Sequence, residues 1–254
     1  DSEKEKLDRE AILAADNVKD SSVRYFVDGL LNKDRLIDYI ENFILFENQR
    51  IKIIAKNHQY LGVNNLMESV KNRKELNGKL GDFWHTQGSG KSYSMVMFAR
   101  KVKRKIAGNF SFLVITDRED LDTQIHKNFV RTEVIGSKEE CQPKDSKQLR
   151  DSLTTNKAFI FTLIHKFNKS DVEPIYPDHD IIIMSDEAHR SQYGLYADNM
   201  MKLLPTAARI GFTGTPLLSL QSVPLAAIYQ SMILNELLRM VLRCHYIMKI
   251  VVLS

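Results

Sequence analysis

The stretch that most constrains this sequence is Gly88-Ser89-Gly90-Lys91-Ser92. It follows Asp82-Phe83-Trp84, typical of the end of a buried strand, and precedes residues 93–106, which contain neither Gly nor Pro. A strand, a glycine turn and a helix N-terminus form an anion site, because backbone N–H groups and the helix dipole favour negative charge. The sequence therefore predicts a phosphate-binding loop, with Lys91 on the β- and γ-phosphates and the Ser92 hydroxyl on Mg²⁺.

One position departs from the general phosphate-loop pattern. That pattern is G-x-x-x-x-G-K-[ST], and His85 stands where its first glycine would be. The remaining glycines, Gly88 and Gly90, still let the backbone approach phosphate oxygens closely, with Ser89 between them. Taken alone, the stretch leaves an ordinary Gly-Ser turn before a helix as the alternative.

Composition is compatible with many functions. The chain has 254 residues, 43% of them hydrophobic and 27% charged, which is ordinary for a soluble protein. Its net charge of +4 permits a nucleic-acid partner without arguing for one. Cys141 and Cys244 suggest neither a disulfide framework nor a zinc site, so we expect a cytoplasmic location. The chain begins at Asp1 and not at Met, which indicates a processed product or, as we prefer, a fragment.

After the loop, short apolar runs alternate with helix-compatible segments. The runs, typical of buried parallel strands, cover residues 112–116, 158–162, 181–184 and 209–213. Helices are expected over residues 121–130, 146–155 and 195–204. This alternation predicts an α/β fold with a parallel sheet covered by helices on both faces. Such sheets bind ligands at the carboxyl ends of their strands, and each polar cluster described next follows a strand end.

Two clusters extend the predicted phosphate site. Asp186 and Glu187 follow the third apolar run and open the sequence Asp-Glu-Ala-His. Asp186 is predicted to take the Mg²⁺ held by Ser92, and Glu187 to orient a water that attacks the γ-phosphate. Residues Thr213, Gly214 and Thr215 follow the last run, where two hydroxyls can sense the phosphate state, although a plain turn is the local alternative.

Other strand ends offer weaker signals. Arg118, Thr162 and Lys166 are candidates for binding a DNA backbone. A capped helix start around Arg118 and a solvated Lys166 explain the same residues equally well. Gln59 precedes Lys91 by about 30 residues, and its amide suits the N6 and N7 edge of adenine. A surface glutamine on a helix is the alternative there.

Together these clusters resemble the superfamily 2 helicases and translocases, in their first RecA-like motor domain. Five stretches in order narrow the resemblance to the R subunit of type I restriction-modification enzymes; they are residues 56–60, 84–92, 116–124, 186–194 and 211–217. His85 is the residue that this family carries at its position. The resemblance implies a RecA-like parallel sheet with helices on both faces, preceded by an N-terminal helical segment.

The resemblance also implies an activity and partners. It implies an ATP- and Mg²⁺-dependent motor that pulls duplex DNA before cleavage, assembled with methyltransferase and specificity subunits. It implies a nuclease domain upstream and a second RecA-like domain downstream. Since arginines from the second domain complete the ATP site of such motors, residues 1–254 are expected to hydrolyse ATP poorly alone. Another superfamily 2 DNA or RNA helicase domain and a catalytically silent nucleotide-binding module remain as alternatives.

Three parts are expected along the chain. Residues 1–50 form a helical linker or packing segment whose helical pattern continues to residue 70, and residues 51–218 form the motor domain. Residues 219–254 form an atypical tail, rich in Leu, Ile, Met and Val. With permissive codon choices, a shift of one base over residues 231–253 restores a sequence like the family's continuation. We therefore hypothesise a frameshift, which sequencing of the gene tests.

Overall fold

The computed structural model describes residues 32–84, 89–136, 141–186 and 193–213. The chain divides into two compact units, Ile37–Leu217 and a second made of Asp1–Leu36 with Leu218–Ser254. The first unit holds every element discussed below, apart from the first residues of α3 (Lys33–Asn42). The predicted tail and residues 1–31 of the predicted helical segment lie outside the described residues.

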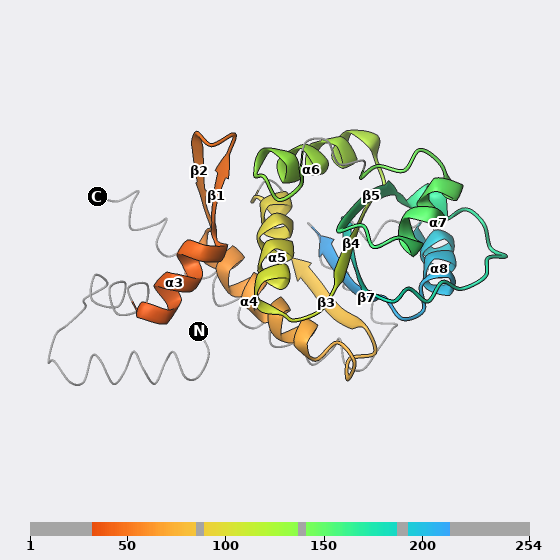
Figure 1. The fold of residues 1–254 in the computed structure, drawn as a ribbon, viewed down its shortest axis with the longest axis horizontal. Helices are drawn as coiled ribbons and strands as arrows, with labels where there is room; N and C mark the ends of the chain where they lie inside the picture. The colour runs from red at the N-terminus through yellow and green to blue at the C-terminus, as the bar shows by residue number, and fades with distance from the viewer. Residues whose placement is uncertain (1–31, 85–88, 137–140, 187–192, 214–254) are drawn as a thin grey trace, which may run out of the picture. The chain divides into compact units, whose positions relative to one another are not determined.

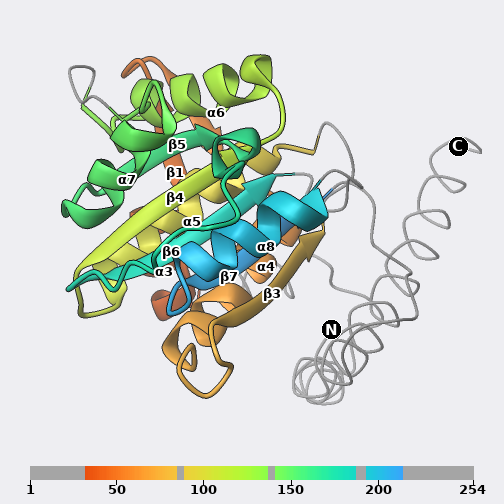
Figure 2. The same cartoon turned by 90° about the vertical axis from the view of Figure 1, so that its right-hand side faces the viewer.

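A five-stranded parallel sheet forms the centre of the first unit. Its strands are β3 (Lys79–Trp84), β4 (Phe110–Thr116), β5 (Phe159–Leu163), β6 (Asp180–Asp186) and β7 (Ala208–Thr213). They lie side by side in the order β3-β7-β6-β4-β5, and every neighbouring pair is parallel (Figure 2). The predicted apolar strands are therefore confirmed, as is the strand that precedes the phosphate loop.

Helices cover both faces of this sheet (Figure 1). One face carries α4 (Asn57–Lys71), α5 (Lys91–Lys105) and α6 (Glu119–Arg131), and the other carries α7 (Ser146–Thr154) and α8 (Tyr193–Leu203). Strand β4 contributes to both cores, with Phe112 and Val114 in the first and Leu113 and Ile115 in the second. Because successive strand side chains point to opposite faces, a sheet buried on both sides needs the continuous apolar runs seen in the sequence. This is the RecA-like α/β arrangement that was expected.

The segment before α4 is a β-hairpin, where the sequence predicted continuous helix. Strand β1 (Ile44–Glu47) pairs antiparallel with β2 (Ile51–Ile54). Asn48 and Gln49 lie in the turn with φ of 49° and 58°, a left-handed conformation that reverses the chain. The helix prediction is wrong for these strands, because isoleucines in so short a segment fit a strand as well as a helix turn. It is confirmed for α3, which ends just before the hairpin.

Lys101 holds α5 against two neighbouring helices. Its Nζ lies 2.6 Å from both carboxylate oxygens of Asp38 on α3 and 2.6 Å from Oδ1 of Asn64 on α4. Burial lowers the pKa of the Lys101 ammonium, while Asp38 acts in the opposite direction. A buried charge is tolerated only with such partners. These bonds fix the helix whose first turn carries Lys91 and Ser92.

Candidate functional site

The described part of the phosphate loop runs into α5 at Gly90. Gly90 is the residue before the helix and has a φ of 93°, which a residue with a Cβ rarely adopts. A Cβ at this position would lie 3.1 Å from Nε2 of Gln59, so a side chain here would crowd the Gln59 amide in addition to straining the backbone. Ser89 is also described, whereas Gly88 and His85 lie outside the described residues. The structure thus places Lys91 and Ser92 in the first turn of α5, as predicted.

Lys91 faces the end of another strand. Its Nζ lies 2.9 Å from Oδ1 of Asp186, the last residue of β6. The Lys91 side chain is 17% exposed and the Asp186 side chain 6% exposed, so the ion pair is largely shielded from water. Strands β3, β7 and β6 lie next to one another and run parallel. Their carboxyl ends therefore lie at the same end of the sheet, where residues far apart in the sequence can meet. The ion pair brings Lys91 and Asp186 together at the carboxyl ends of the strands, where the sequence predicts a site.

Ser92 has a partner that the sequence did not predict. Nδ2 of Asn128, on α6, donates a hydrogen bond of 2.9 Å to the Ser92 hydroxyl. Asn128 is buried, with 7% of its surface exposed. Its type and position in an amphipathic helix carry no signal of a site, because the contact joins segments 36 residues apart.

The side chains present fit a Mg²⁺ ion held jointly with a ligand. Ser92 and Asp186 supply a hydroxyl and a carboxylate, the hard oxygen donors that Mg²⁺ prefers. Among the residues that the structure describes, no group of three or more His, Cys, Asp or Glu side chains is arranged to hold a metal. Mg²⁺ commonly uses one or two protein oxygens and takes the rest from phosphates and water. The donor set therefore suits a phosphate-bound ion.

Gln59 lies beneath the loop, with 4% of its surface exposed. Its Nε2 donates to the carbonyl of Gly90 at 3.1 Å and to Oγ of Ser94 at 3.0 Å, and its Oε1 accepts from the backbone N–H of Lys56 at 2.8 Å. The neighbouring His58 makes a hydrogen bond with the backbone of Ser89, and desolvation lowers its pKa. In this conformation the Gln59 amide supports the loop, so contact with adenine would require it to exchange these bonds.

Replacing Gln59 with alanine is expected to loosen the phosphate loop. The carbonyl of Gly90 and the hydroxyl of Ser94 would lose a buried donor, at a cost of about 1–2 kcal/mol in the free energy of unfolding. Urea unfolding of the Gln59→Ala variant measures this loss. Asn65→Ala is the matched control, since it truncates an exposed amide on the same helix. Equal stability of the two variants would contradict the supporting role of Gln59.

Thr213 lies on β7, the strand between β3, which leads to Lys91, and β6, which ends at Asp186. It is the last residue of β7, where it pairs with Trp84 of β3, and its neighbour Phe212 pairs with Asp186 of β6. Thr213 is 6% exposed. Its predicted partners in sensing phosphate, Gly214 and Thr215, lie outside the described residues, and so does Glu187. Of this trio the structure describes Thr213, which lies at the end of β7 beside the end of β6 that carries Asp186.

The three candidates for DNA binding differ in accessibility. Arg118 is exposed, and its guanidinium bonds the carboxylate of Asp120 at 3.0 and 2.8 Å. Lys166 lies in η1 (Ile164–Phe167), directly after β5, and its ammonium donates to the carbonyl of Pro143. Thr162 is 1% exposed, since it lies inside β5, so its hydroxyl is not accessible to a DNA backbone in this conformation.

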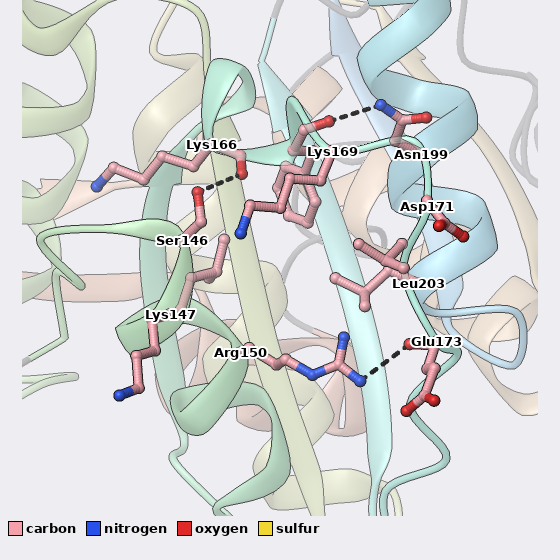
Figure 3. Close-up of a pocket in the computed structure, with 12 residues that line it drawn as sticks. Ser146, Lys147, Arg150, Lys166, Lys169, Asp171, Glu173, Asn199 and Leu203 are labelled. Carbon is pink, nitrogen blue, oxygen red and sulfur yellow. Dashed lines mark hydrogen bonds between the residues drawn. The ribbon is translucent and has the colours of Figure 1, made fainter.

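A basic pocket lies beside Lys166 between α7, η1 and α8 (Figure 3). Its volume is about 450 Å³, and its charged lining consists of Lys147, Arg150, Lys166, Lys169, Asp171 and Glu173. Hydrogen bonds from Ser146 to the Lys166 carbonyl and from Asn199 to the Phe167 carbonyl join its walls. In Figure 3 the ammonium of Lys166 points away from the other lining residues. The sequence predicted Lys166 as a contact but did not predict this pocket.

A glycine turn at the start of α5, a buried Lys–Asp pair and a parallel sheet with helices on both faces are features of nucleotide-binding α/β domains. The family model of the SWI2/SNF2 ATPases matches residues 58–240. This chain belongs to that family. Within the described residues, no helix has the length and apolar character needed to cross a membrane.

Two of the proteins similar to this chain are endonuclease subunits of type I restriction enzymes. The endonuclease subunit of the type I restriction enzyme HindI from Haemophilus influenzae is 38% identical over 78% of this chain and 21% of that protein. The putative MjaIXP endonuclease subunit from Methanocaldococcus jannaschii is 34% identical over 74% of this chain and 19% of that protein. The solved UvsW helicase from bacteriophage T4 has a TM-score of 0.47 and 12% identity, covering 82% of this chain and 69% of that one. The chain thus spans about a fifth of the length of the two restriction subunits.

Proposed function

We propose that this chain is the ATP-binding motor domain of a type I restriction endonuclease R subunit. The observation that carries the proposal is the buried pair between Lys91 at the start of α5 and Asp186 at the end of β6. ATP-driven motors need a cation for the phosphates and a carboxylate for the metal at one sheet edge, and this pair supplies both. The identity of 38% with the HindI endonuclease subunit supports the restriction assignment.

The proposed roles follow the geometry of the site. Lys91 binds the β- and γ-phosphates, Ser92 and Asp186 hold Mg²⁺, and Glu187 orients the attacking water. A bound Mg²⁺ would neutralise phosphate charge and polarise the γ-phosphoryl group. Gly88, Ser89 and Gly90 supply backbone N–H groups to the phosphates, and Gln59 reads adenine once it has exchanged its bonds to the loop. Thr213, Gly214 and Thr215 couple the phosphate state to movement along duplex DNA.

The proposed partners are duplex DNA and the methyltransferase and specificity subunits of a restriction complex. Arg118 and Lys166 follow neighbouring strand ends, since β4 pairs with β5 at Thr116 and Leu163. An exposed Arg–Asp pair such as Arg118 with Asp120 contributes little stability, so exchanging the carboxylate for a DNA phosphate costs little. Thr162 is the least suitable of the three candidates because of its burial.

A salt titration tests Arg118, which is exposed, and Lys166, which is half-buried. Arg118→Ala and Lys166→Ala are each expected to weaken duplex binding for all sequences alike, and to lower the slope of log affinity against log salt by about one. Fluorescence anisotropy with a labelled duplex measures the slope. Lys74→Ala is the control, since Lys74 is exposed and precedes β3, at the amino end of the sheet. A slope unchanged in both variants would remove these residues from the DNA site.

Linked binding of nucleotide and nucleic acid tests the function itself. The affinity of this chain for a fluorescent ATP analogue with Mg²⁺ is measured alone, with duplex DNA and with single-stranded RNA. We expect duplex DNA to strengthen nucleotide binding, and linkage then requires nucleotide to strengthen duplex binding by the same factor. A larger gain in nucleotide affinity with RNA than with duplex DNA would favour an RNA helicase. Nucleotide affinity that neither nucleic acid changes would favour a catalytically silent nucleotide-binding module.

A further inference from the structure

Asn128 reaches the phosphate site from a helix outside the phosphate loop. Its Nδ2 donates to the Ser92 hydroxyl at 2.9 Å, and the side chain is shielded from water. Helix α6, which carries Asn128, lies next to α5, which carries Ser92 (Figure 1). The bond is therefore a direct link from α6 to the residue proposed to hold Mg²⁺.

The packing of α6 fixes the position of the Asn128 amide. Ile125 and Phe129, on either side of it along the helix, are 4% and 0% exposed and belong to the core on this face of the sheet. The backbone carbonyl of Asn128 accepts from the Thr132 hydroxyl at 2.7 Å and from the Thr132 N–H at 3.1 Å. Because the helix backbone is held in this way, the Asn128 amide is presented to Ser92 from a fixed point on α6.

The chemistry of a serine hydroxyl gives this bond a consequence. The oxygen has one proton to donate and two lone pairs. The Asn128 N–H occupies one lone pair, so the hydroxyl proton points elsewhere and the second lone pair remains for a cation. Because the Asn128 amide is a donor, the Ser92 oxygen acts toward it only as an acceptor. A carboxylate in its place would instead accept the Ser92 hydroxyl proton. A hydroxyl ligand of Mg²⁺ coordinates through one such lone pair.

We propose that Asn128 is a positioning residue that orients the Ser92 hydroxyl for Mg²⁺. The proposal rests on the proposed nucleotide-binding function of the same site. Partners that orient metal ligands typically change metal affinity by roughly 10- to 100-fold when removed. Loss of the amide donor is therefore expected to weaken the Mg²⁺-dependent part of nucleotide affinity to that extent.

Two substitutions separate the hydrogen bond from packing. Asn128→Leu keeps the branched shape of the side chain and removes the donor, whereas Asn128→Ala removes both. Isothermal titration calorimetry of this chain with ATP, over a range of Mg²⁺ concentrations, gives the apparent Mg²⁺ affinity of each variant. Asn65→Ala is the matched control, because it truncates an exposed amide on α4. Melting temperatures show whether each variant is folded. If Asn128→Ala is unfolded, the Mg²⁺ titration of Asn128→Leu alone tests the proposal.

Each outcome decides a different claim. A 10- to 100-fold loss of Mg²⁺ affinity in Asn128→Leu, together with no effect of Asn128→Leu in a chain that already carries Ser92→Ala, supports the proposal. Wild-type Mg²⁺ dependence in Asn128→Leu overturns it and leaves the nucleotide-binding function intact. Absence of ATP binding by the wild-type chain overturns the proposed function and this inference together.

Discussion

Replacing Lys91 with methionine is expected to destabilise the domain and to weaken nucleotide binding at the same time. Asp186, whose side chain is 6% exposed, would keep its charge and lose the ammonium 2.9 Å away. Breaking a buried pair in this way costs about 3 kcal/mol in the free energy of unfolding. Loss of a charge-assisted bond to phosphate also lowers nucleotide affinity about 10- to 100-fold. Urea unfolding and calorimetry with ATP and Mg²⁺ measure the two effects.

A double variant separates these two effects. Lys91→Met combined with Asp186→Asn removes both charges, so most of the lost stability should return, because no uncompensated charge remains in the protein interior. Nucleotide affinity should stay low, because neither the phosphate-binding cation nor the carboxylate for Mg²⁺ is restored. If the double variant were no more stable than Lys91→Met alone, the buried pair would not be the reason for the destabilisation.

The second large effect is expected in the core beneath α5. Phe98 is fully buried, and its ring lies 6.4 Å from that of Phe112 on β4 and 6.5 Å from that of Phe212 on β7, measured between centroids. Phe98→Ala would leave a cavity between the helix and the strands, at a cost of about 3–5 kcal/mol. Since domains of this kind are stable by only about 5–15 kcal/mol, this is a large share of the total.

Thermal and urea unfolding measure the Phe98→Ala effect. Tyr176→Ala is the matched control, since this aromatic side chain is 68% exposed and its loss should change stability by less than about 0.5 kcal/mol. Phe98→Leu should lie between the two, because it retains most of the buried apolar volume. Similar stability of Phe98→Ala and Tyr176→Ala would show that α5 does not depend on this core.

The sheet was predictable because its strands are buried on both faces. Residues 112–115, for example, are apolar at every position, and this pattern distinguishes a central parallel strand from an amphipathic helix. Strands β1 and β2 are not buried on both faces, since Phe46, Ile51 and Ile54 are exposed, and their short apolar runs fit a helix turn equally well. Their turn also contains Asn48 and Gln49 in place of the glycine that often marks a hairpin.

The candidate site was predictable where residue type and strand position act together. Lys91 follows one strand and Asp186 ends another, and parallel neighbouring strands bring their carboxyl ends to the same end of the sheet. The support from Gln59 and Asn128 was not predictable, because both depend on how α4 and α6 pack against α5. A side-chain bond of this kind leaves no pattern in the local sequence, so only the folded arrangement reveals it.

The measurement that tests this account most directly is calorimetric titration of ATP into the 254-residue chain, with Mg²⁺ and with a chelator. The account predicts binding that strengthens with Mg²⁺ and that falls about 10- to 100-fold in Lys91→Met. Equal affinity for ATP in the wild type and in Lys91→Met, with no response to Mg²⁺ in either, would contradict it.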